Sequence, residues 1–101
     1  MNQPQGGLSN AGPGRWALAG DLVFDNAARI LDEGTAAFGA EARAEIDLAG
    51  VRRVDSAGLA LLVEWSAAAR GDGRIVTYRN VPAVLGALAG ISDLTQFFEP
   101  A

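Results

Sequence analysis

The spacing of hydrophobic and polar positions changes several times along the chain, and each change predicts a new element. Apolar or small residues alternate with polar ones over residues 44–48, which is typical of a short strand that ends at Ala49-Gly50. Residues 15–19 and 74–78 predict two further strands, the latter from its β-branched and aromatic content. A weaker edge strand is expected near Leu8, joined to residues 15–19 by a turn at Pro13-Gly14.

Helical spacing of apolar residues predicts a first helix after Asp25, which we expect to be its N-cap. Gly34 in its middle is unfavourable by about 1 kcal/mol relative to alanine. The apolar positions of this helix are Ala27, Ile30, Leu31, Ala37 and Phe38. A second helix is predicted from Asp55 or Ser56 to about Arg70, where the glycine-rich residues 71–73 stop it.

A third helix is predicted with Pro82 in its first turn. Its expected buried stripe consists of Val81, Val84, Leu85, Leu88 and Ile91. Beyond it, Leu94, Phe97 and Phe98 are expected to fold back onto the core. The alternation of strands and helices predicts an α/β domain with a mixed sheet and helices covering mainly one face. We expect residues 1–12 to be a disordered tail and residues 13–101 to be the domain, with the weak strand from residue 8.

Composition excludes several kinds of chemistry. The sequence has no cysteine and no histidine, so it lacks thiolate nucleophiles, the commonest general base and the commonest metal ligands. All eight basic residues are arginine, which leaves no lysine for a Schiff base or a phosphate-binding P-loop. We therefore expect no cofactor and no metal.

Charge and hydropathy also limit the partners. The net charge is -4 and the arginines are scattered, which argues against nucleic acid. No apolar run approaches the roughly 20 residues that a membrane span requires, and the first twelve residues do not resemble a secretory signal. The expected location is the cytoplasm.

One stretch, residues 46–62, carries the most specific pattern: IDLAGVRRVDSAGLALL. It resembles the signature of the STAS domain family, in which a strand ending in Asp-Leu and a loop precede Asp-Ser/Thr-x-Gly-Leu at the start of an apolar helix. Residues 18–22 are similar to the Leu-x-Gly-Glu-Leu segment of the same family, with Asp21 in place of glutamate. The resemblance covers residues 8–98 and implies a STAS-like fold that acts by binding another protein.

Two branches of that family imply different partners. The run from Gly58 to Leu62, the short length and the ending near Phe98 are most similar to MlaB, the STAS subunit of the Mla phospholipid-transport ABC complex. That likeness implies an MlaF-like ATPase as partner, at the cytoplasmic face of the inner membrane. Ser56, however, replaces the threonine of MlaB and is similar to the phosphorylated serine of anti-sigma-factor antagonists, whose partner is an anti-sigma factor kinase. Both alternatives stay open, and the first is favoured.

The turn formed by Asp55, Ser56, Ala57 and Gly58 is the candidate partner-binding site. In the plainest interpretation, Asp55 or Ser56 is an ordinary helix N-cap. In the functional interpretation, the hydroxyl group of Ser56 and the small size of Ala57 and Gly58 let a partner backbone approach the positive end of the helix. Phosphorylation of Ser56 would then add negative charge and release a docked partner.

The helix after this turn has two apolar faces, and only one can lie on the sheet. Leu59, Leu62, Val63 and Ser66 form the first, and Ala57, Leu61, Trp65 and Ala68 form the second. Leu61 and Trp65 either form an exposed patch beside the turn, or pack against the helix ending at Phe38 or the one starting at Pro82.

Charged residues near the turn complete the candidate site. Arg52 and Arg53 precede the turn and are candidates to pair with an acidic group or a phosphate on a partner, although a solvated loop explains at least one of them. Asp47 and Asp55 do not form a recognisable catalytic pair, because no histidine and no Gly-x-Ser-x-Gly elbow accompany them. The sequence therefore predicts a protein that is not an enzyme.

Overall fold

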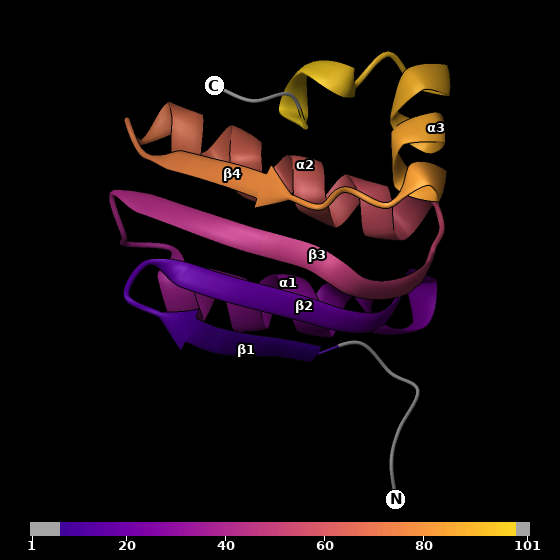
Figure 1. Ribbon diagram of the computed structural model, residues 1–101. Coiled ribbons are helices and arrows are strands. Elements are labelled where there is room, and N and C mark those ends of the chain that lie inside the picture. Colours follow the sequence, from indigo (N-terminus) through magenta and orange to yellow (C-terminus); the bar gives the residue numbers. More distant parts are fainter. Residues whose placement is uncertain (1–6, 99–101) are drawn as a thin grey trace, which may run out of the picture.

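The computed structural model describes residues 7–98, which form a four-stranded mixed sheet with helices against it (Figure 1). The strand order is β1-β2-β3-β4, in which β1 runs antiparallel to β2 and the other neighbours are parallel. The elements in chain order are β1 (Gly7–Gly12), β2 (Arg15–Leu22), α1 (Phe24–Phe38), β3 (Arg43–Val54), α2 (Ser56–Gly71), β4 (Ile75–Arg79), α3 (Ala83–Ile91) and the 3-10 helix η1 (Thr95–Phe97). The predicted α/β fold class is confirmed.

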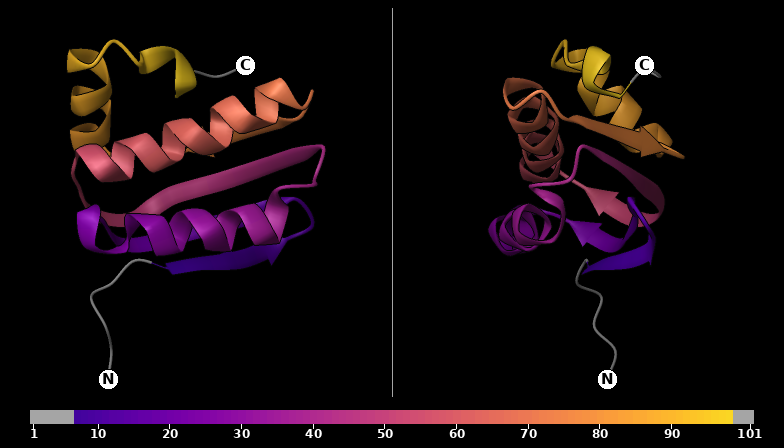
Figure 2. Two further views of the ribbon diagram at one scale, coloured as in Figure 1. Left: turned by 180° about the vertical axis from the view of Figure 1, so that it is seen from behind. Right: turned by 90° about the vertical axis from the view of Figure 1, so that its left-hand side faces the viewer.

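Two helices cover one face of the sheet, and the other face is open (Figure 2). Parallel neighbours require crossover connections, and α1 and α2 supply them between β2 and β3 and between β3 and β4. The core lies between these helices and the sheet. Its largest fully buried side chains are Phe38, Leu18, Leu22, Ile30, Ile46, Leu48, Leu62 and Leu85.

Strands β2 and β3 are longer than the sequence predicted, and β4 has the predicted length. Residues 7–12 pair with β2 as β1, which confirms the edge strand expected near Leu8 and places these residues in the sheet. Residues 1–6 of the predicted tail lie outside the described residues. β3 does not end at Gly50 but continues to Val54, beside β2. Gly50 fits there because it has no side chain: a Cβ atom would lie 3.0 Å from that of Ala19 on β2. A glycine that looked like a strand end therefore marks a close contact between strands.

The N-cap of α1 is Val23, and the prediction of Asp25 is wrong because Asp25 lies within the first turn. The side chain of Asn26 performs the capping instead. Its Oδ1 accepts a hydrogen bond from Val23 N at 3.0 Å, and its Nδ2 donates to the carbonyl oxygen of Asp21 at 2.9 Å. Asn26 is buried, and a buried amide group needs hydrogen-bond partners. These two bonds provide them.

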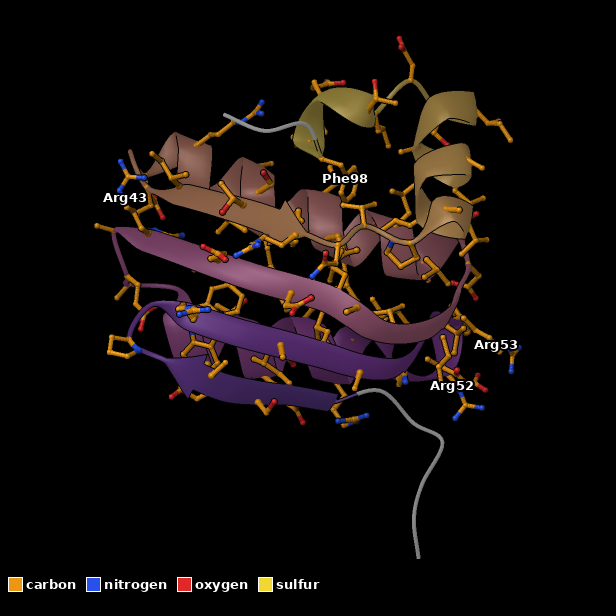
Figure 3. The ribbon with its side chains drawn as sticks, in the orientation of Figure 1. Arg43, Arg52, Arg53 and Phe98 are labelled. Atoms are coloured by element: carbon orange, nitrogen blue, oxygen red, sulfur yellow. The ribbon has the colours of Figure 1, made fainter. Side chains whose placement is uncertain are left out.

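The last helix, α3, buries less than its apolar sequence predicted. Leu85 and Ala89 are buried, whereas Val84 and Ile91 are 48% and 85% exposed, which corrects the predicted stripe. A helix of nine residues beside the sheet can place only one narrow line of side chains inward. Phe98 follows η1 (Figure 3). The centroid of its ring lies 5.3 Å from that of Tyr78. None of the helices in residues 7–98 is long and apolar enough to cross a membrane.

Candidate functional site

Asp55 joins the beginnings of α1 and α2. Its Oδ1 accepts hydrogen bonds from the backbone N–H groups of Ala57 at 2.9 Å and Gly58 at 3.2 Å. These N–H groups belong to the first turn of α2 and have no acceptor within the helix. Its Oδ2 accepts a third, at 3.0 Å, from Phe24 N at the first residue of α1. One carboxylate therefore caps one helix and fixes the start of the other.

The pKa of Asp55 is lowered from its ordinary value of 3.8, and two opposing effects determine the result. Burial desolvates the carboxylate, which raises the pKa, but the backbone hydrogen bonds from Phe24, Gly58 and Ala57 and from its own N–H together lower it by more. The carboxylate is therefore charged at neutral pH, when it accepts hydrogen bonds most strongly.

Ser56 is the first residue of α2 and is exposed. Its hydroxyl group makes no hydrogen bond with any residue in the described range 7–98. The sequence predicted either Asp55 or Ser56 as the N-cap of α2, and the structure shows that Asp55 is the N-cap. The fold does not use the Ser56 hydroxyl group, which remains open to solvent.

Gly58 has a different role from the one predicted. A Cβ atom at this position would lie 2.2 Å from the carbonyl oxygen of Leu22 at the end of β2. The missing side chain therefore allows α2 to approach β2 within the domain, and it does not leave space for a partner. Of the predicted turn residues, Ser56 is exposed, Ala57 is half-buried and Gly58 is buried.

Trp65 and Leu61 are each only 3% exposed, so the prediction that they form an exposed patch is wrong. The indole Nε1 of Trp65 donates to the carbonyl oxygen of Leu31 in α1 at 3.2 Å. Its ring packs edge-on against Phe38 with centroids 5.0 Å apart. The alternative in which Trp65 packs against the helix ending at Phe38 is confirmed, because α1 covers the second apolar face of α2.

A shallow apolar groove of about 270 Å³ lies between α1 and α2, close to the Ser56 turn. It is lined by Ala27, Ala28, Leu31, Ala57, Ala60, Leu61 and Glu64. We call these residues the helix groove. The hydrophobic pattern did not predict this groove, although small residues on two neighbouring amphipathic helices are a signal for a depression between them.

Phe24 and Ser56 lie at the same end of the helix groove. Phe24 is the first residue of α1, is 79% exposed, and precedes Ala27 and Ala28 by about one helical turn. Ser56 precedes Ala60 in the same way on α2. The free hydroxyl group, an exposed aromatic ring and an apolar depression thus occur together.

Arg52 and Arg53 extend from the end of β3 that leads into the Ser56 turn (Figure 3). Both are exposed. Nη1 of Arg53 lies 3.6 Å from Oδ2 of Asp21, but its side chain is 74% exposed, so this ion pair contributes little to stability. Arg52 forms no ion pair with the residues that the structure describes.

Asp47 does not form a pair with Asp55. It lies on the open face of the sheet, opposite Ala17 and Arg79 in the strand register. Its Oδ1 accepts hydrogen bonds from Asn80 Nδ2 at 3.0 Å and from Ala49 N at 2.9 Å, and these bonds hold its pKa below the ordinary 3.8. Within residues 7–98 no group of histidine, cysteine or acidic side chains is arranged to hold a metal ion.

Comparison with protein families relates this geometry to known proteins. Residues 10–99 match a family model described as "Mlab, STAS domain". This range includes all four turn residues, both arginines and the helix groove. Among curated protein sequences, none is significantly similar to the chain.

Solved structures show the same fold in different contexts. A candidate anti-sigma factor antagonist from Thermotoga maritima superposes with a TM-score of 0.75 at 13% identity, over 92% of this chain and 82% of the other. Two larger proteins contain similar domains. The crystal structure of Mglu matches with a TM-score of 0.59 at 26% identity, over 75% of this chain and 19% of Mglu. The murine anion transporter Slc26a9 matches with a TM-score of 0.60 at 20% identity, over 82% of this chain and 14% of the transporter.

Proposed function

Because the chain belongs to the STAS domain family, we propose that it is an MlaB-like subunit of an Mla-type phospholipid-transport ABC complex. In this role it binds the cytoplasmic ATPase of the complex, which is MlaF-like, and supports its assembly or activity. The match of residues 10–99 to a family model described by the name Mlab supports this choice. The protein would then act in the cytoplasm, held at the inner membrane by its partner.

The observation that carries the proposal is the division of roles between two adjacent residues. Asp55 accepts three backbone hydrogen bonds from the two helices, whereas Ser56 is exposed with a free hydroxyl group. A residue that the fold does not need, on a turn that the fold holds rigidly, is well suited to recognise a partner. Arg52 and Arg53 extend the proposed surface with positive charge beside it.

We propose that the protein is not an enzyme. Ser56 has no base within hydrogen-bond reach among residues 7–98 to remove its proton. Asp47 and Asp55 are engaged in separate hydrogen-bond networks and are both charged at neutral pH. Binding is therefore the activity that the site supports best.

A second candidate function rests on the same hydroxyl group. An exposed serine at the start of a 16-residue helix is accessible to a kinase, and a phosphate there would be stabilised by the helix N-terminus. In that case the chain would be an anti-sigma-factor antagonist, and its partner would be the kinase that modifies Ser56. Asp55 next to it would oppose the phosphate through like-charge repulsion.

Co-purification tests the first proposal. The tagged wild-type chain and its Ser56→Arg variant are expressed in the native host, and bound proteins are identified by mass spectrometry. We expect the wild type to retain an ABC ATPase and Ser56→Arg to lose it, because the bulky cation occupies the turn. Ser92→Arg is the matched control, since Ser92 is also exposed but lies beyond α3. Equal ATPase yields for wild type and Ser56→Arg would contradict the proposal.

Intact-mass measurement of the protein from the same host separates the two functions. A phosphate group located on Ser56, with a kinase as the captured protein, would support the antagonist. An unmodified chain that retains an ATPase would support the MlaB-like subunit.

A further inference from the structure

The helix groove and the Ser56 turn form one continuous surface along α2. Ser56, Ala60 and Glu64 are spaced four residues apart, so their side chains follow one line of the helix. Ala60 and Glu64 line the groove and all three are exposed. A partner that contacts Ser56 therefore also meets the groove.

The groove is suited to an inserted side chain. The side chains of the alanines that line it end at Cβ and leave a depression beside the half-buried Leu31, and its volume of about 270 Å³ suits a single large apolar side chain. Phe24 at its end is 79% exposed, which is unusual for an aromatic ring and typical of an interface anchor.

The charges beside the groove indicate the chemistry of the partner. Glu64 lines the groove, and Asp32 follows Ala28 by one turn on α1, which places it beside the groove as well. Both are exposed, and neither forms an ion pair with another residue between 7 and 98. An apolar depression flanked by free carboxylates is complementary to an apolar side chain accompanied by lysine or arginine.

We propose that the helix groove binds a basic amphipathic helix of the partner ATPase, which inserts one large apolar side chain between α1 and α2 and pairs a cation with Glu64. This inference rests on the proposed function and adds a second point of contact to the Ser56 turn. Two points fix the orientation of the partner, whereas the turn alone would leave it free to rotate.

Binding measurements on purified proteins test the inference, with the captured ATPase as the probe. Ala28→Phe fills the groove with a phenyl ring, and we expect the affinity to fall at least about tenfold, as for the loss of an interface anchor. Ala36→Phe is the matched control, because Ala36 is an exposed alanine of the same helix outside the groove. We expect its affinity to stay within about twofold of the wild type. Glu64→Lys is expected to weaken binding at least about tenfold, and Glu64→Gln by less.

Each outcome has a defined meaning. If Ala28→Phe binds as tightly as Ala36→Phe, or if Glu64→Lys binds as tightly as the wild type, the inference is wrong. In either case the loss of binding by Ser56→Arg would leave the proposed function intact. Full binding by Ser56→Arg would instead contradict the proposed function itself. Tryptophan fluorescence, which comes from Trp16 and the buried Trp65, reports whether each variant is folded.

Discussion

The indole ring of Trp65 occupies the space beside Gly34, where a Cβ atom would lie 2.1 Å from Cζ2. The same indole donates its N–H to the carbonyl oxygen of Leu31, three residues earlier in α1. A glycine within a helix is unfavourable by about 1 kcal/mol, but here it allows a large aromatic side chain of α2 to lie against the backbone of α1. The two helices that flank the candidate site are therefore held together by this pair.

Replacing Gly34 by alanine should destabilise the protein, although alanine is the better helix former. The added methyl group must displace the ring of Trp65, and we expect a loss of about 2 kcal/mol in the free energy of unfolding. Urea unfolding followed by tryptophan fluorescence measures it. Gly86→Ala in α3 is the control, because a Cβ there meets nothing within 4 Å and should stabilise by up to about 1 kcal/mol. Equal effects of the two substitutions would contradict the contact.

Gly58→Ala should be more damaging than Gly71→Ala, although both positions lie in α2. At Gly58 a Cβ would lie 2.2 Å from a backbone oxygen of Leu22, which cannot rotate away as a side chain can, whereas at Gly71 it meets nothing within 4 Å. We expect Gly58→Ala to reduce the free energy of unfolding by about 3 kcal/mol and Gly71→Ala to leave it nearly unchanged. Thermal unfolding followed by circular dichroism separates them. A Gly58→Ala protein as stable as the wild type would show that α2 does not approach β2 so closely.

Asp55→Asn should cost about 1 to 2 kcal/mol at neutral pH, because it removes the charge and the second acceptor oxygen from the cap. The loss should depend on pH. The pKa of Asp55 is lower in the folded protein than its ordinary 3.8, so the unfolded chain binds the proton first as pH falls. The stability contributed by the carboxylate is thus present above about pH 3.8 and is lost as pH falls through the folded pKa.

Unfolding free energies measured for both proteins from pH 7 down to about pH 2.5 provide the check. We expect the difference between wild type and Asp55→Asn to be constant near neutrality and to shrink below pH 3.8. A difference that grows on acidification would show that the sign is wrong.

Tyr78 should resist ionisation until the protein unfolds in alkali. Burial raises its pKa well above the ordinary 10.0, and its hydroxyl group donates to the carbonyl oxygen of Leu62 in α2. Because the unfolded chain releases this proton first, the free energy of unfolding should fall as pH rises above 10.0. Tyr78 is the only tyrosine, so tyrosinate absorbance reports it directly. Ionisation of the folded protein near pH 10 would contradict the burial. Tyr78→Phe should abolish the signal and cost about 1 kcal/mol at neutral pH.

Hydrophobic spacing, residue content and turn residues were together sufficient to predict the strands, the helices and their order, because these signals are local in the sequence. These signals were not sufficient to determine the structural role of individual glycines. Gly50 and Gly58 looked like a strand end and an open surface, yet both allow close contacts between segments far apart in the chain. Such contacts depend on tertiary distances, which local patterns do not contain.

Only part of the candidate site could be predicted, because the rest of it also depends on tertiary distances. The turn at Asp55 and Ser56 was found from its motif, but which of the two residues caps the helix depends on backbone geometry. The burial of Trp65 depended on Gly34, which the sequence indicated only as a weak point in a helix. The helix groove arises from two helices packed side by side, so neither helix predicts it alone.

The bond from Phe24 N to the Asp55 carboxylate joins residues 31 positions apart. The N–H group of Phe24, the first residue of α1, therefore lacks this partner until the chain has passed through β3 and reached Asp55. A nascent chain that ends before Asp55 would have the local cap from Asn26 but not this bond. The hydrogen bonds at the start of α1 are thus complete only after the turn proposed to recognise the partner has formed.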